Sequence, residues 1–402
     1  MRGCLTRKAL VLGSAGALAL GVGGCTHAQP TGHPAPELKI VPLIQVDKNG
    51  APVAIPPGVV PADPAGDGKA TCAPVSIAFM GATTGPDSVL GTNVRDGAEL
   101  AVHLHNAKNP GCQVQFKQYD TGGNPQAATT VAPRIVDDQY TLGMVGPVFS
   151  TDAKTAGSVL SQAGLVSITP SAANAALTQN GWSTFFRGLA NDAEQGPAIA
   201  AYLQNTLKDQ KVCVIDDGTD HSLGLATLIR QTLGAVADPT CTISVKKGEK
   251  DFSATVSQIK TVKPQSVFYA GSYAEAAPLA QQLHDAGVTA QFIGSDGVKD
   301  PEFLKQSGPA AKGALLTCAC GPATGQFAKY YQQKFGQPPG TFSAEGYDVA
   351  TILLKAIDSG AATRAAVLKF VSNYDGQGVA RHYKWDDTGE LSNPLIWVYK
   401  AE

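Results

Sequence analysis

Short apolar runs that alternate with amphipathic segments are the feature that most constrains this chain. From Cys72 onward each run is short enough for a buried strand, and most are followed by a segment of helical periodicity. The runs lie at 75–82, 113–120, 141–148, 165–170, 211–217, 241–247, 266–272 and 291–296, and the helical segments lie at 92–106, 125–138, 151–163, 222–234, 252–262 and 274–286. Strands separated by helices of about 10 to 15 residues indicate βαβ units, which build parallel sheets covered on both faces. The expected fold class is α/β.

Length and charge bound the architecture and the partners. The chain has 402 residues, 43% of them hydrophobic, which exceeds the roughly 250 to 300 residues at which a single core stops growing. Two lobes are therefore expected. Charged residues make up 16% of the chain and the formal net charge is −2, so no basic field is available to hold nucleic acid. We expect a small or neutral partner.

The first residues have the pattern of an export signal. Arg2, Arg7 and Lys8 precede an apolar stretch that is too short to span a membrane as a helix. VGGC, residues 22–25, resembles the lipobox of bacterial lipoproteins, in which the cysteine is lipidated after cleavage. That resemblance implies a signal peptide over 1–24 and a lipid on Cys25 that anchors an extracytoplasmic or periplasmic protein to the outer face of the cell membrane. An ordinary cleaved signal is the alternative.

A tether is expected between this anchor and the folded part. Residues 25–71 are rich in Pro, Gly and Ala, a composition typical of linkers. Within them, two apolar runs flank Asn49-Gly50, which is a hairpin signal. We expect a small appended hairpin over 38–56.

The remaining cysteines would lie in an oxidising compartment, where pairing is favoured over free thiols. Apart from Cys4 and Cys25, they are Cys72, Cys112, Cys213, Cys241, Cys318 and Cys320. One expected pair, Cys213 and Cys241, joins two successive strands. Another, Cys72 and Cys112, joins two residues that each precede a strand. A bridge within CxC would strain a regular strand. A metal site there is the weaker alternative, because no histidine or second such pair stands close by in the sequence.

Motifs for nucleotide cofactors and for hydrolysis are absent from the sequence. No GxGxxG follows the first expected strand, and neither GxxxxGK[ST] nor GxSxG occurs. DDGTDHSLG, residues 216–224, brings Asp, His and Ser together, but triads are recognised by geometry and not by closeness along the chain. We interpret it as a loop whose helix is capped by Asp220 or Ser222. No cofactor, metal or catalytic residue is expected.

Three loops at the carboxyl ends of expected strands could hold a small charged ligand. PVFSTD places Ser150 where its hydroxyl could cap the next helix. SITPSAANAALT turns at Ser171, and the amides of 171–173 could face an anion. IGSDGV presents Asp296. Each loop taken alone is more often a cap or a surface turn, but together they offer partners for the carboxylate and the ammonium of a free amino acid.

From about Val75 to Tyr399 the sequence resembles the periplasmic leucine/isoleucine/valine-binding proteins, the receptors of ABC importers for branched-chain amino acids. The resembling segments keep the order of that family and include VGPVFSTDAKTAGSVL, LVSITPSAANAALT, NDAEQGP, GEKDFS and FIGSDGV. The resemblance implies two Rossmann-like lobes of the type I periplasmic binding protein fold, joined by three crossovers and closing on a ligand by hinge bending. Lobe 1 would comprise 72–190 and 319–377, and lobe 2 would comprise 191–318 and 378–402.

The resemblance also implies roles for site residues. Ser150 corresponds to the serine that receives the ligand carboxylate, and Ser171 to the residue whose backbone lies beside the ligand's head group. Ala173 stands where the family usually has a threonine for the ligand ammonium. Asp296 stands where the family has a glutamate for the same group. The aromatic positions of the family's site read here as Leu90, His221 and Ser272, with Tyr273 one place later.

The resemblance, together with the lipobox-like VGGC, implies a solute-binding lipoprotein of an ABC importer. It would capture a small carboxylate-bearing ligand, an amino acid of the branched-chain type, between its lobes and present it to an ABC permease without performing any chemistry. A sensor of the same fold, which detects amides or small organic or aromatic acids and acts on a signalling partner, is the alternative. An enzyme is a remoter one, because the motifs supply no set of nucleophile, base and oxyanion donors.

Overall fold

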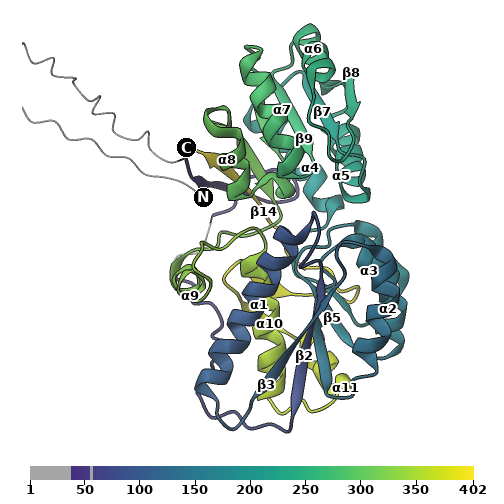
Figure 1. The fold of residues 1–402 in the computed structure, drawn as a ribbon, viewed down its shortest axis with the longest axis vertical. Helices are drawn as coiled ribbons and strands as arrows, with labels where there is room; N and C mark the ends of the chain where they lie inside the picture. Colours follow the sequence, from purple (N-terminus) through teal and green to yellow (C-terminus); the bar gives the residue numbers. More distant parts are fainter. Residues whose placement is uncertain (1–37, 55–57) are drawn as a thin grey trace, which may run out of the picture. The chain divides into compact units, whose positions relative to one another are not determined.

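The structure is a computed structural model that describes residues 38–54 and 58–402. Residues 38–402 form one compact unit that contains two open β-sheets, each with helices packed on its faces (Figure 1). The α/β fold class is therefore confirmed. The expected signal peptide, Cys25 and the first part of the tether lie outside the described residues.

Lobe 1 is built on a parallel sheet with the strand order β3-β2-β4-β5-β6. Its strands are β2 (Val75–Gly81), β3 (Val114–Asp120), β4 (Thr141–Val145), β5 (Val166–Thr169) and β6 (Phe185–Arg187). Helices α2 (Pro125–Val136) and α3 (Ser150–Gln162) pack together on one side, and α1 (Ser88–Lys108) packs against α10 (Ser343–Asp358) on the other (Figure 1). Helix α11 (Arg364–Ser372) contacts β4 and β5. The continuous burial of β2, β4 and β5 follows from this double cover.

Lobe 2 is built on a mixed sheet with the order β1-β14-β11-β10-β9-β7-β8. Its strands are β1 (Ile40–Val46), β7 (Val212–Asp216), β8 (Ala237–Ser244), β9 (Ser266–Ala270), β10 (Gln291–Gly294), β11 (Leu315–Cys318) and β14 (Ile396–Ala401). Strands β7 to β11 are parallel, whereas β14 and β1 run antiparallel to their neighbours. The helices are α4 (Asp192–Ala201), α5 (Asp220–Leu233), α6 (Ser253–Val262), α7 (Tyr273–Asp285) and α8 (Pro301–Ser307).

Smaller elements complete the described chain. Helix α9 (Gly325–Phe335) packs near α1, and β12 (Asp375–Gln377) pairs with β13 (His382–Lys384) in a separate two-stranded ribbon. Short helical turns lie at η1 (Ala175–Asn180), η2 (Tyr202–Thr206), η3 (Gly234–Val236), η4 (Asp296–Val298) and η5 (Gly308–Ala311). Because β11 belongs to one sheet and α10 and α11 cover the other, the chain crosses between the lobes more than once.

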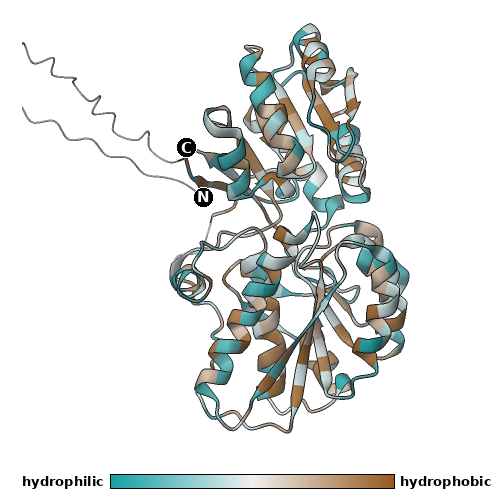
Figure 2. Cartoon of the chain, in the orientation of Figure 1, coloured by the Kyte–Doolittle hydropathy of each residue, from teal (hydrophilic) through white to brown (hydrophobic). Residues whose placement is uncertain are grey.

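All of the strands and helices expected up to residue 296 are present, with shifted ends. Hydrophobic residues are concentrated in the central strands of the sheets, and many hydrophilic residues lie on the helices (Figure 2), as the periodicity predicts. Strand β14 was not predicted, and β11 was considered only as the strand that would carry the CxC pair. Strand β6, with three residues, is too short to give a periodic signal.

The hairpin expected over 38–56 differs in the structure. Its turn is present, because the Asp47 carboxylate accepts from the N–H groups of Asn49 and Ala51 and Gly50 adopts a φ of 70°. The first arm, however, is strand β1, which pairs along its length with β14. The second arm is limited to a bridge between Val46 and Pro52, where the N–H of Val53 donates to the carbonyl of Gln45 at 2.8 Å. A short hairpin is therefore present, but its first arm extends the sheet of lobe 2 and does not stand apart from it. Pairing with an otherwise open sheet edge explains the difference.

Two buried carboxylates of α10 hold segments that pass between the lobes. Glu345 accepts from the N–H of Gly321 at 2.7 Å and pairs with Arg381 at 2.9 Å. Asp348 accepts from the N–H groups of Val379 and Ala380 at 2.7 and 2.8 Å. Burial raises the pKa of Asp348 to about 7, although these N–H groups favour its charged form. Helix α10 thus anchors the region between the lobes to lobe 1.

All three cysteine couples are disulfide-bonded, as Cys72–Cys112, Cys213–Cys241 and Cys318–Cys320. The strain expected for the CxC pair assumed a regular strand. Strand β11 ends at Cys318, so Cys320 lies outside the strand and the chain is free to turn between them. The bonded pair also leaves no thiolate for the metal site considered as an alternative.

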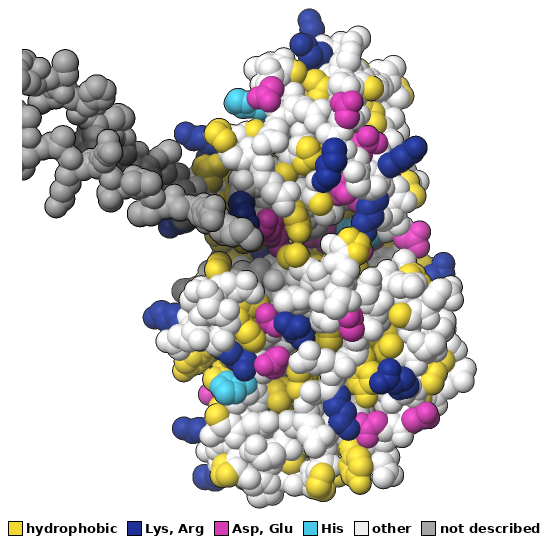
Figure 3. All heavy atoms as spheres, viewed as in Figure 1, with side chains coloured by type: hydrophobic (Ala, Val, Ile, Leu, Met, Phe, Trp, Pro, Cys, Tyr) yellow, Lys and Arg dark blue, Asp and Glu magenta, His cyan; other side chains and the backbone are white. Residues whose placement is uncertain are grey.

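Charged side chains of both signs are spread over the face of the molecule drawn in Figure 3, without a large patch of one sign. This distribution agrees with the net charge of −2 and offers no track for a nucleic acid on that face. Among the described helices, none combines the length and the apolar character needed to cross a membrane.

Candidate functional site

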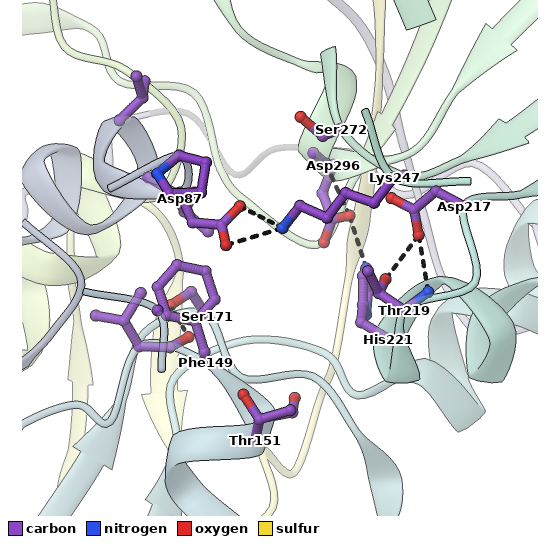
Figure 4. A pocket seen from close by; sticks show the side chains of 18 of the residues that line it. Asp87, Phe149, Thr151, Ser171, Asp217, Thr219, His221, Lys247, Ser272 and Asp296 are labelled. Atoms are coloured by element: carbon purple, nitrogen blue, oxygen red, sulfur yellow. Dashed lines mark hydrogen bonds and ion pairs between the residues drawn. The ribbon is translucent and has the colours of Figure 1, made fainter. Parts of the chain in front are cut away.

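A cavity of about 460 Å³ lies where the two sheets face each other. Most of its wall is formed by segments that follow β2, β3, β4 and β5 in lobe 1 and by segments that follow β7, β8, β9 and β10 in lobe 2 (Figure 4). All of these are carboxyl ends of strands in parallel sheets, the place where ligands of open α/β sheets bind. The fold therefore concentrates loop residues from both lobes around one cavity.

Seven of the eight site residues predicted from the sequence line this cavity. They are Leu90, Ser150, Ser171, His221, Ser272, Tyr273 and Asp296. Ala173 does not line it. The Ala173 side chain is buried in the hydrophobic core, and its carbonyl accepts from the N–H of Asp192 at 2.8 Å. The ligand-facing position expected for Ala173 is therefore not seen.

Ser150 is the first residue of α3 and not its cap. The cap position is Phe149, and no side chain caps the helix. The Ser150 hydroxyl oxygen instead accepts from the N–H of Asn174, 3.2 Å away. The hydroxyl hydrogen stays available to donate to an acceptor in the cavity. Because the first N–H groups of any helix lack intrahelical partners, this wall can offer several donors to an anion.

The polar groups of the Ser171 loop, which were expected to face a ligand, are hydrogen-bonded within the protein. The N–H groups of Ser171 and Ala172 donate to the Thr169 hydroxyl at 3.4 and 2.9 Å. The Ser171 hydroxyl donates to the carbonyl of Val148 at 2.7 Å. The anion site predicted at amides 171–173 is therefore wrong for the first two amides. The loop shapes the wall, and Thr169, which the sequence analysis did not single out, fixes it.

His221 lies between two carboxylates on the lobe 2 wall. Its Nε2 is 3.1 Å from Asp296 Oδ1, and its Nδ1 is 3.3 Å from Asp192 Oδ1. Burial disfavours the charged ring, but Asp192 and Asp296 outweigh burial and raise the pKa of His221 well above its ordinary value. Asp296 therefore already has a cationic partner within the protein (Figure 4).

A second ion pair connects the two walls. Lys247, which follows β8 in lobe 2, places its Nζ 2.8 and 2.9 Å from the two carboxylate oxygens of Asp87, which precedes α1 in lobe 1 (Figure 4). Both residues line the cavity and keep part of their surface exposed. This pair could not be predicted from the sequence, because the partners are 160 positions apart and neither belongs to a recognisable motif.

Further carboxylates and aromatic rings complete the lining. Asp217 accepts from the N–H and hydroxyl of Thr219, the residue that caps α5. Thr219 therefore caps α5, and the prediction of Asp220 or Ser222 as the cap is wrong. Phe342, the residue before α10, also lines the cavity. Its φ of 61° is a conformation that no sequence pattern predicted.

One cluster of potential metal ligands occurs in the described part of the chain, and it lies away from the cavity. His105, Cys112 and Asp358 bring one ligand atom each within 4.8 Å of the others. Cys112 is bonded to Cys72, so its sulfur is not a thiolate. His105 Nε2 lies 2.8 Å from Asp358 Oδ1, which satisfies both groups without an ion.

Two α/β lobes with a cavity between the carboxyl ends of their strands are the architecture of two-lobed solute-binding proteins. The sequence model of the periplasmic binding protein family matches residues 74–401, so the chain belongs to that family. The expected family and fold are thus confirmed. Proteins of this family bind solutes for transporters.

Known relatives agree with this assignment. The chain is 31% identical to the Leu/Ile/Val-binding protein homolog 3 of Brucella melitensis, over 83% of this chain and 93% of that protein. A similar solved structure is that of the branched-chain amino acid transporter substrate-binding protein LivJ of Streptococcus pneumoniae in complex with isoleucine. Its superposition on this chain gives a TM-score of 0.74 at 24% identity and covers 82% of this chain and 99% of that one. A solute-binding protein of Rhodopseudomonas palustris in complex with benzoate has a TM-score of 0.72 at 16% identity, with 82% and 94% coverage.

Proposed function

We propose that the protein is an extracytoplasmic receptor of an ABC importer that captures a small carboxylate-bearing amino acid, of the branched-chain type, between its lobes. The observation that carries the proposal is the cavity itself, which opposes hydroxyl and amide donors on one wall to a carboxylate on the other. A free amino acid has the matching pair of charges. The name of the Brucella relative supports the same class of ligand.

The wall of lobe 1 suits the carboxylate of such a ligand. The Ser150 hydroxyl hydrogen is available, and the start of α3 adds backbone N–H groups and the positive end of a helix dipole. Hydrogen bonds to a charged group contribute about 1.5 to 3 kcal/mol each, which is enough to dominate the affinity of a small ligand.

The wall of lobe 2 suits the ammonium, and the apolar lining suits a hydrocarbon side chain. Asp296 is nearly buried and presents its carboxylate to the cavity. Leu90, Phe149 and Phe342 supply apolar surface from lobe 1. A volume of about 460 Å³ is at the lower end of the range for small-molecule pockets, which fits a single amino acid.

The proposed receptor performs no chemistry and works with two partners. Closure of the lobes on the ligand would create the surface that an ABC permease recognises. A lipid on Cys25 would hold the protein at the outer face of the membrane, in agreement with the lipobox-like VGGC.

A thermal-shift screen of residues 38–402 against amino acids, amides and carboxylic acids tests the proposal. A ligand at about a hundred times its dissociation constant stabilises the folded state by about 2.7 kcal/mol. We expect leucine, isoleucine or valine to raise the melting temperature. If every amino acid fails while an unrelated acid raises it, the amino-acid ligand is wrong.

The ion pair between His221 and Asp296 favours one alternative, a receptor or sensor for acids that lack an ammonium group. Such a ligand would leave the pair intact. The benzoate complex supports the idea that this fold accommodates aromatic acids. Stabilisation by benzoate or an aliphatic acid, together with no response to amino acids, would favour this alternative.

A further inference from the structure

The imidazole of His221 sits between one carboxylate that faces the cavity and one that lies behind it. Asp296 lines the cavity, whereas Asp192, at the start of α4, is buried and does not. The ring nitrogens reach these two carboxylates at 3.1 and 3.3 Å, and 30% of the His221 side chain remains exposed. A cation that enters the cavity therefore meets a carboxylate that is already shared.

Asp296 has one carboxylate oxygen left for a ligand. Its Oδ1 accepts from His221 Nε2 and from the N–H of Gly297, 3.1 and 3.0 Å away. Its Oδ2 accepts no hydrogen bond from any residue in 38–54 or 58–402. A ligand ammonium would bind Oδ2 and would then lie beside the imidazole on the same carboxylate.

The other charged groups around this ring are mostly acidic. Asp217 and Asp220 belong to the loop and helix of His221 itself and line the same cavity. Lys247, after β8, directs its ammonium to Asp87 in lobe 1. In the free protein the ring thus stays charged, since Asp192 and Asp296 raise its pKa against the effect of burial.

We propose that a ligand ammonium bound at Asp296 Oδ2 expels the proton of His221, so that ligand capture is coupled to proton release. The inference rests on the proposed amino-acid ligand. Two cations on one carboxylate repel each other, and the imidazolium is the one that can lose its charge near neutral pH. The proton passes to the solvent, and the neutral ring can keep its remaining proton on Nδ1, which lies 3.3 Å from Asp192 Oδ1.

The sign of the pH dependence follows from proton counting. The free protein binds more protons than the complex between the pKa of His221 in the complex and its higher pKa in the free protein. Ligand affinity therefore rises with pH through that window, by up to about tenfold per pH unit for one proton, and levels off on either side. A ligand without an ammonium group lacks this dependence.

Titration calorimetry with leucine, isoleucine and valine tests the coupling. Measurements from about pH 6 to about pH 9, each in two buffers of different ionisation enthalpy, give both the affinity and the number of protons released. His221→Asn is the main variant, because its amide can still donate to Asp296 but does not titrate. We expect up to one proton released by the wild type and, in H221N, only what the ligand's own amine explains.

Asp192→Asn gives a second reading that does not remove the histidine. It takes away a carboxylate behind the ring, so the window of rising affinity should move to lower pH. Equal proton release and equal pH slopes in wild type and H221N would overturn the coupling while leaving the amino-acid receptor in place. Absence of binding by all three amino acids at every pH would overturn the proposed function and the coupling with it.

Discussion

The two walls of the cavity differ in how they can hold a ligand. Among the described residues that line it, lobe 1 contributes one charged side chain, Asp87, and otherwise offers hydroxyl, backbone and apolar groups. Lobe 2 contributes the charged side chains Asp217, Asp220, His221, Lys247, Asp296 and Asp300. Neutral donors at a helix start are fixed by the backbone, whereas ionised side chains change with pH and with salt. The wall of lobe 1 therefore mainly orients a ligand, whereas the wall of lobe 2 mainly attracts it by charge.

Removal of the ligand-facing charge in lobe 2 should have the largest effect. We expect Asp296→Asn to weaken amino-acid binding by about a hundredfold, because the ammonium loses its counter-ion and lies beside an imidazole that keeps Asp192 as its acidic neighbour. Calorimetry of the variant measures the loss. Asp220→Asn is the matched control, since Asp220 is exposed at the edge of the same cavity and should change affinity by less than about twofold. Equal effects of the two substitutions would show that the charge of this wall acts only as a field.

Removal of the hydroxyl in lobe 1 should have a smaller effect. Ser150→Ala deletes one donor to the ligand carboxylate but leaves the N–H groups at the start of α3 in place. We expect a loss of about tenfold in affinity, the lower end for a hydrogen bond to a charged group, without a change in pH dependence. Ser158→Ala, on the exposed side of α3, is the control for helix stability. An unchanged affinity in S150A would remove Ser150 from the site.

The sequence predicted the parts of this arrangement that have local causes. Alternating strands and helices gave the α/β sheets, and the positions of Ser150 and Asp296 at strand ends placed both in the cavity. The cap at Thr219 and the bonding of Ser171 to Thr169 were missed, because neighbouring polar residues compete for the same N–H groups.

Pairings between distant segments could not be predicted in this way. Strand β1 found its partner β14 at the opposite end of the chain, where no hairpin signal operates. His221 was expected as a pocket residue, but its contacts with Asp192 and Asp296 depend on how α4, α5 and β10 pack. Such contacts decide the charge of the site, so the ligand was less predictable than the fold.

The smallest expected effect belongs to the one contact that spans the walls. The pair of Lys247 and Asp87 joins residues of different lobes, so it can form only when the lobes are close together. Both side chains are partly exposed, and such pairs contribute less than about 1 kcal/mol. We expect Lys247→Met to speed ligand release by about two- to fivefold with little change in the association rate, as measured by stopped-flow fluorescence.

A charge reversal separates this contact from a general effect of charge on the lobe 2 wall. The single change Asp87→Lys should speed release as K247M does, and the double variant D87K/K247D should restore slow release, because the pair is rebuilt with its ends exchanged. Lys250→Met is the control, since Lys250 is a nearby lysine that donates to the carbonyl of Ala274 within lobe 2. If the double variant releases ligand as fast as the single ones, the two walls are held together by the ligand alone and the difference between them ends at the cavity surface.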